Sequence, residues 1–287
     1  CKTRQLMIRL LKLEYLKNLN YKPFKVFAGL YFIVLIALLF IGLVDFDLFG
    51  AKINLKEQGM YDFPGVWNFT SYIVGLLKIF LGCIIVFSIC QEFSNRMFKQ
   101  NLIDGLSREE FIISKLLTIL VFTGFSTLFF FVIAFILGKS YSVTQESDLV
   151  FKEIYFIFNY FLKLFTFFSF LMFLSVLFRK SIFVFLGFFM VWFGEGILSG
   201  IEKFTMMKNI DPKNKATMVL DHTYLTDFLP LGSMSALIPN PAVRTNMGKM
   251  FGMEFKFDYP WESVVACIVW SAIFVAGSYW ILKKKDW

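Results

Sequence analysis

The sequence contains little of what enzymes use at their active sites. Of its 287 residues, one is histidine, His222, and four are cysteines. The cysteines show neither the spacing of a metal site nor a disulfide framework, and no nucleophile stands near His222. Gly138-Lys139-Ser140 ends like a phosphate-binding loop, but that motif needs a glycine at position 133, which is Ile133 here. We therefore expect no catalytic residue and no ATP site in this chain.

Charge is also scarce, at 17% of residues, whereas hydrophobic residues make up 57% and phenylalanine alone contributes 40. Soluble domains are about 45–50% apolar. The net charge is +8, but no segment alternates basic and aromatic residues on a polar surface, so we expect no nucleic-acid binding. This composition indicates an integral membrane protein.

Six apolar runs are long enough to cross a bilayer, since about 20 residues at 1.5 Å each span a hydrocarbon core of about 30 Å. The stretches 26–44, 116–137 and 263–282 carry no charge, and the other three runs contain one each: Lys78, Lys163 or Glu195. The expected spans are about 26–44, 67–90, 111–138, 154–178, 182–198 and 263–282. The predicted fold is an all-α polytopic membrane protein, with a single transmembrane domain over residues 23–287.

The distribution of Lys and Arg predicts the orientation of these spans. With both termini in the cytoplasm, the inner segments hold sixteen basic residues and the two short outer loops hold four. The long segment 201–260 then lies outside, where the rule is weak. The net positive charge is thus mainly a feature of topology.

The first 22 residues are too polar to cross the bilayer. Leucines and Met7 recur at helical spacing between basic residues such as Arg4, Arg9, Lys12 and Lys17. This pattern predicts an amphipathic helix lying in the cytoplasmic headgroups. A plain topology anchor is the alternative.

Residues 91–104, between the second and third spans, form a pattern that an ordinary loop does not need. Glu92, Arg96 and Lys99 alternate with an apolar side that includes Phe98, which predicts a short amphipathic helix. Asp104-Gly105 is a helix stop. A Ser107–Glu110 capping box then restarts the chain as helix. The pattern predicts a docking surface for a soluble partner, and an unspecialised amphipathic loop is the alternative.

This segment resembles the intracellular loop of ABC-2 type transporter permeases. The matching positions are Glu92, the Ser107-Arg108 pair and Lys115, whereas Arg96-Met97 replaces the Gly-Thr that the family often has. The resemblance implies an exporter subunit that works with a separate cytoplasmic ATPase, which holds ATP and magnesium. The residues that would couple to it are Glu92, Arg96, Phe98, Lys99, Ser107 and Arg108.

The resemblance further implies a second permease subunit, an N-terminal helix beside the ATPase, and a bacterial inner membrane. It also implies short re-entrant helices in the outer segment, acting as a lid, and a folded outer loop without a gating role is the alternative. Five prolines in 201–260 exclude one long helix there, while residues 216–238 have room for one or two short ones.

A methionine cluster lies in the same outer segment. Met247, Met250 and Met253 are spaced by three, so their thioethers can line one helix face and hold Cu(I), a soft ion, with His222 as a further ligand. Filling of irregular apolar gaps is the ordinary role of such methionines.

The three charges inside the predicted spans are the remaining functional signal, because a charge at the bilayer centre costs about 2.5–3.5 kcal/mol on insertion scales. Lys78 and Glu195 are candidates for a pair that braces two spans. Lys78, Lys163 and Glu195 are alternatively a polar wall of a substrate path. Snorkelling of the long lysine side chains is the third interpretation.

Two other function classes fit parts of this pattern. A membrane scaffold would recruit the ATPase without transporting anything. An integral membrane enzyme would need clustered His, Asp or Glu at one depth, which the sequence lacks.

Overall fold

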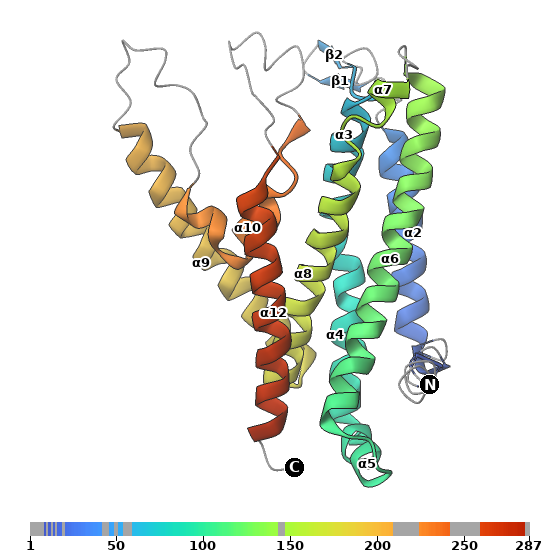
Figure 1. The fold of residues 1–287 in the computed structure, drawn as a ribbon, viewed down its shortest axis with the longest axis vertical. Coiled ribbons are helices and arrows are strands. Elements are labelled where there is room, and N and C mark those ends of the chain that lie inside the picture. Colours follow the sequence, from blue (N-terminus) through green and yellow to red (C-terminus); the bar gives the residue numbers. More distant parts are fainter. Residues whose placement is uncertain are drawn as a thin grey trace.

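The computed structural model describes residues 9, 11–12, 14, 16–18, 21–41, 46–48, 51–53, 59–142, 147–208, 224–241 and 259–284. These residues form a bundle of long helices (Figure 1). The predicted helical class is confirmed. The exception is a hairpin of two three-residue strands, β1 (Phe46–Leu48) and β2 (Ala51–Ile53), which pair antiparallel.

Four of the described helices are long and apolar enough to span a membrane. They are α6 (Arg108–Tyr141), α8 (Tyr155–Phe178), α9 (Ser181–Lys208) and α12 (Trp261–Lys284). A fifth is the pair α3 (Gly65–Leu76) and α4 (Lys78–Ser94), which is bent by 41° at Leu77. Helix α2 (Lys22–Ile41) overlaps the first expected span but is not among these, so the count of six spans stays a prediction.

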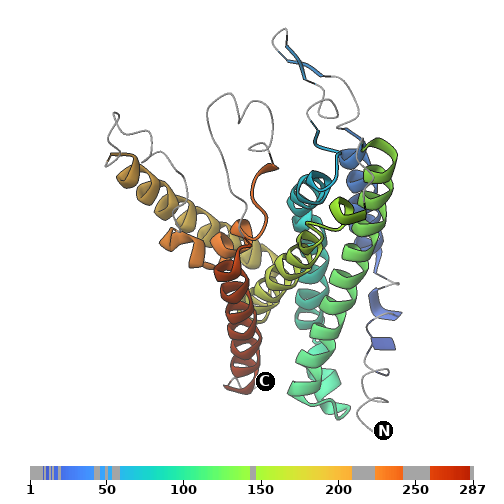
Figure 2. The same cartoon turned by 45° about the horizontal axis from the view of Figure 1, so that its top comes forward.

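Helix α8 lies at the centre of the bundle. It packs against α3, α4, α6, α9, α10 and α12. Most of its span is buried, 72%, whereas α9 leans away from the bundle and is 11% buried (Figures 1 and 2). The exposed face of α9 carries large apolar side chains such as Phe189, Trp192 and Phe193, as expected of a surface that meets lipid or another subunit.

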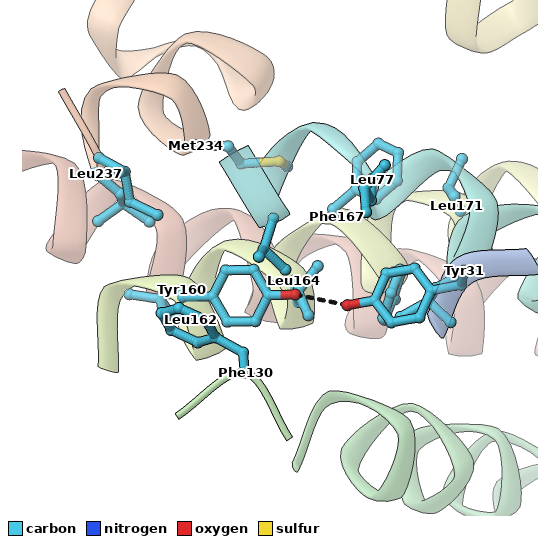
Figure 3. Packing of buried hydrophobic residues seen from close by; sticks show 14 of the residues in the cluster. Tyr31, Leu77, Phe130, Tyr160, Leu162, Leu164, Phe167, Leu171, Met234 and Leu237 are labelled. Carbon is cyan, nitrogen blue, oxygen red and sulfur yellow. Dashed lines mark hydrogen bonds between the residues drawn. The ribbon is translucent and has the colours of Figure 1, made fainter. Parts of the chain in front are cut away.

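The buried core contains a polar connection among three helices. The hydroxyls of Tyr31 of α2 and Tyr160 of α8 lie 2.9 Å apart (Figure 3). Both contact the Ser126 hydroxyl of α6, at 2.5 and 3.0 Å. All three side chains are buried. Hydroxyl contacts of this kind hold helices together where the surroundings offer no water.

Short helices follow α9. η2 (Leu225–Phe228) and α10 (Pro230–Ala236) lie between α9 and α12 (Figure 1). The expectation of one or two short helices in 216–238 agrees with this arrangement, but α9 continues to Lys208, so the first eight residues of the expected outer segment are helical. α7 (Ser147–Val150) is a further short helix, before α8.

Candidate coupling site

The segment between α4 and α6 is broken where one continuous helix, 91–104, was expected. Residues 91–94 complete α4, Arg96 adopts a left-handed conformation with φ of 58°, and α5 then spans Met97–Ile103. The cause is aromatic packing: Phe93 and Phe98 contact each other, with ring centroids 5.2 Å apart. Residues five apart in one helix point about 140° away from each other, so the break at Arg96 lets both rings face one core.

Phe98 is part of that core and not of a docking surface. Its side chain is 1% exposed, and its ring lies 4.8 Å from that of Phe111, measured between centroids. Apolar residues of α6, α8 and α12 complete the cluster: Phe111, Ile112, Val176, Ile281 and Leu282. Phe98 therefore anchors α5 to three long helices.

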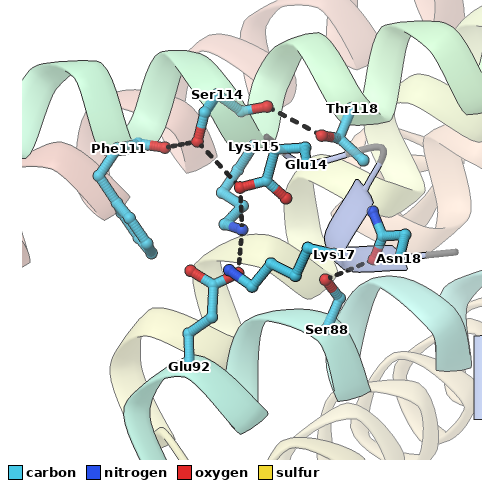
Figure 4. A network of polar contacts seen from close by, with 9 residues as sticks. All are labelled: Glu14, Lys17, Asn18, Ser88, Glu92, Phe111, Ser114, Lys115 and Thr118. Carbon is cyan, nitrogen blue, oxygen red and sulfur yellow. Dashed lines mark hydrogen bonds and ion pairs between the residues drawn. The ribbon is translucent and has the colours of Figure 1, made fainter. Parts of the chain in front are cut away.

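Glu92 is also buried, at 0% exposure, which corrects the expectation that it faces the partner. Its carboxylate forms ion pairs with Lys17 of the N-terminal segment and Lys115 of α6. The Lys115 ammonium also lies 2.7 Å from the Glu14 carboxylate (Figure 4). These residues, Glu14, Lys17, Glu92 and Lys115, are the four-charge cluster.

The four-charge cluster has no net charge, with two acids and two bases. Buried charges are tolerated when they are paired and hydrogen-bonded. Ser114 adds a hydroxyl 3.4 Å from Glu14, and Ser88 of α4 donates a hydrogen bond of 3.1 Å to Asn18 beside it. The cluster thus fixes the N-terminal segment against α4 and α6. Glu14 and Lys17 therefore point into the protein. The amphipathic helix predicted for the first 22 residues would instead have its charged side, including Lys17, in the lipid headgroups.

The start of α6 agrees with the expected capping box. The Ser107 side chain accepts a hydrogen bond from the Glu110 N–H, and the Glu110 carboxylate accepts one from the Ser107 N–H. Arg108 is engaged within the chain, because its Nη1 donates to the carbonyls of Leu282 and Lys283 at 2.9 and 2.8 Å. A cation at the carbonyl end of a helix satisfies groups left without helical partners. Arg108 therefore ties α6 to the end of α12.

The exposed side of α5 is the part of this segment that a partner protein can contact. Arg96, Lys99 and Gln100 are exposed, and Ile103 is 84% exposed, the most of any described large hydrophobic residue. Ser107 is exposed as well. Of the six coupling residues expected from the sequence, Arg96, Lys99 and Ser107 are accessible, while Glu92, Phe98 and Arg108 build the scaffold beneath.

A cleft of about 320 Å³ lies next to this surface, between α5 and the turn that joins α8 to α9. Four of its seven lining residues are basic: Arg96, Lys99, Arg179 and Lys180. Phe93 and Phe98 give it an apolar wall. We call it the basic cleft.

The three charges within the spans are not paired with each other. Neither Lys78 nor Glu195 forms an ion pair with a described residue. The Lys78 ammonium lies 4.7 Å from the centre of the Phe167 ring. Lys163 is 7% exposed and lies against Gly75 of α3. This arrangement does not support the Lys78–Glu195 brace.

Glu195 instead holds the segment that follows its own helix. Its carboxylate accepts hydrogen bonds from the N–H groups of Leu231, at 3.0 Å, and Gly232, at 2.9 Å, at the start of α10. Glu202 does the same for η2, accepting from the N–H groups of Leu225 and Thr226 at 2.7 and 3.1 Å. Glu202 was not among the residues predicted from the sequence. The seven-residue spacing of two acids on one helix, which places them on the same face, was the available signal.

Glu14, Lys17 and Lys115 were likewise not among the predicted site residues. Met247, Met250, Met253 and His222 lie outside the described residues. Within the residues that the structure does describe, no group of three or more His, Cys, Asp or Glu side chains has the arrangement of a metal site.

Comparison with known proteins decides the family. Residues 32–287 match the family model described as ABC-2 family transporter protein. The chain belongs to the ABC-2 transporter family. No curated protein and no solved structure matches it. As an ABC-2 protein the chain is the membrane permease component of an ABC transporter, a subunit that generally has no ATP site of its own and works with an ABC ATPase.

Proposed function

We propose that this ABC-2 protein is the membrane-spanning subunit of an ATP-driven exporter, and that α5 transmits the movement of a separate ATPase to the spans. The observation that carries the proposal is the contrast between the two sides of α5. One side, with Ile103, Lys99 and Gln100, is exposed, and the other holds Phe98 in the core.

The connections beneath α5 support a coupled movement. The Glu92–Lys115 ion pair joins α4 to α6, and Arg108 joins α6 to the end of α12. Phe98 packs within a cluster that also contains residues of α8. A displacement of α5 is therefore passed to four long helices together, because packed interiors shift between arrangements and do not deform gradually.

In this proposal both termini and α5 face the cytoplasm, and two copies of the chain assemble with two ATPases. The exposed apolar face of α9, with Phe189 and Trp192, supports contact with a second permease subunit. Export is the proposed direction, as the family resemblance implies. The inner membrane of a bacterium is the proposed location.

The test is ATP hydrolysis by the intact complex, purified from its own membranes and reconstituted into liposomes. We expect Ile103→Glu and Lys99→Glu to reduce ATPase association and hydrolysis at least tenfold, because α5 contacts the ATPase directly. Lys25→Glu is the matched control, as it makes the same charge reversal at the exposed start of α2.

Wild-type association and hydrolysis in the α5 variants would contradict the coupling role. A scaffold without transport activity predicts another result: the ATPase would associate through α5, but hydrolysis would not respond to any compound moved across the membrane.

A further inference from the structure

Two cations of the basic cleft, Arg179 and Lys180, lie outside α5, the helix proposed to contact the ATPase. Arg179 and Lys180 are the whole connection between α8, which ends at Phe178, and α9, which begins at Ser181. Both helices are candidate membrane spans. A two-residue connection cannot reach far from the bilayer, so these cations lie at the depth where spans end and lipid headgroups begin.

The chemistry of the cleft favours an anion with an apolar attachment. Its lining contains the cations of Arg96, Lys99, Arg179 and Lys180 and no carboxylate. Arginine and lysine bind phosphate oxygens through charge-assisted hydrogen bonds, which are about twice as strong as neutral ones. Phe93 and Phe98 line the same space. A free phosphate would use the cations alone, whereas a phospholipid would use both kinds of surface.

We propose that the basic cleft binds the phosphate group of an anionic phospholipid from the leaflet at this end of the bundle. Basic pockets between spans are known to hold such headgroups. The lipid lies between α5 and the α8–α9 turn, two elements that are far apart in the sequence. Its phosphate neutralises cations from both elements and thereby joins α5 to the central helix α8.

The experiment measures lipid binding to the full-length purified chain by native mass spectrometry, with phosphatidylglycerol and phosphatidylcholine as the two probes. We expect phosphatidylglycerol to bind at least tenfold more tightly than phosphatidylcholine. The double variant Lys99→Gln/Lys180→Gln should lose about tenfold in phosphatidylglycerol affinity, because it removes two charge-assisted contacts. Lys99→Arg/Lys180→Arg should retain the affinity, which shows that the cleft stays folded.

The control is Lys25→Gln/Lys22→Gln, which removes two exposed lysines from the same end of the bundle, at the start of α2. An equal loss of affinity in this control would overturn the proposal, since general attraction to positive charge would then explain the binding. Equal binding of the two lipids would overturn it as well. Inorganic phosphate that displaced phosphatidylglycerol at similar concentration would assign the cleft to free phosphate and would also overturn the lipid assignment.

Discussion

The Lys115 ammonium and the Glu14 carboxylate, 101 positions apart in the sequence, lie 2.7 Å apart in the structure. This contact fixes the N-terminal segment against the start of the third predicted span. It belongs to the four-charge cluster, which joins α4 to α6, the two helices that α5 connects.

We expect Lys115→Met to destabilise the protein strongly. It leaves the buried Glu92 and Glu14 carboxylates with one cation, Lys17, and removing one partner of a buried ion pair typically costs about 3–5 kcal/mol. The melting temperature in detergent should fall accordingly. The double variant Lys115→Met/Glu14→Gln should recover part of the loss, because it leaves the Lys17–Glu92 pair. A melting temperature unchanged in Lys115→Met would show that the cluster is not structural.

The same substitution at Lys163 should have the opposite consequence. Lys163 is about as buried as Lys115, at 7% against 2% exposure, but it has no ion-pair partner among the described residues. Burying an unpaired charge is unfavourable. We expect Lys163→Met to leave the melting temperature unchanged or raise it. A fall comparable to that of Lys115→Met would mean that Lys163 is paired after all. Loss of transport with stability intact would support a role in the substrate path.

Glu195→Gln should loosen the start of α10. Its carboxylate accepts from the N–H groups of Leu231 and Gly232, and hydrogen bonds to a charged acceptor contribute about 1.5–3 kcal/mol each. We expect faster hydrogen–deuterium exchange at residues 231–232 in the variant. Glu262→Gln, at an exposed position of α12, is the control. If exchange at 231–232 stayed at the wild-type rate, another contact would be holding α10.

Acid should weaken the four-charge cluster through Glu14. Burial alone would raise the pKa of Glu14, but the charges of Lys115 and Lys17 outweigh it and bring the pKa below its ordinary value of 4.5. A carboxyl group with a lowered folded-state pKa contributes stability that is present above its unfolded pKa and lost as the pH falls through the folded one. Below about pH 4.5 the melting temperature should therefore fall more steeply for wild type than for Glu14→Gln. Parallel pH profiles would refute this role of Glu14.

The proposed topology can be tested by labelling single cysteines with a membrane-impermeant maleimide in intact cells, after replacement of the native cysteines. Lys152→Cys should react from outside and Lys99→Cys only after the membrane is opened, since both positions are exposed but lie at opposite ends of the bundle. Labelling of position 99 in intact cells would contradict the cytoplasmic placement of α5 and, with it, the coupling proposal.

The sequence by itself determined the start of α6 and the positions of the long apolar helices, because both depend on residues close together in the chain. The capping box of Ser107 and Glu110 joins positions three apart, so the start of α6 was predictable from the chain. Long apolar runs likewise predicted α6, α8, α9 and α12, because a run of that length needs a helix to satisfy its backbone in a bilayer.

Tertiary structure decided which charges are free and which are used inside. Glu92 and Lys99 look alike as members of one charged helix side, but only packing places Glu92 beside Lys17 and Lys115 and leaves Lys99 exposed. Periodicity also placed Phe98 on a continuous helix, whereas its contact with Phe93 and Phe111 required the break at Arg96. The apolar sequence around Glu195 did not predict its hydrogen-bond partners. The N–H groups of Leu231 and Gly232 come close to Glu195 only because η2 and α10 pack between α9 and α12.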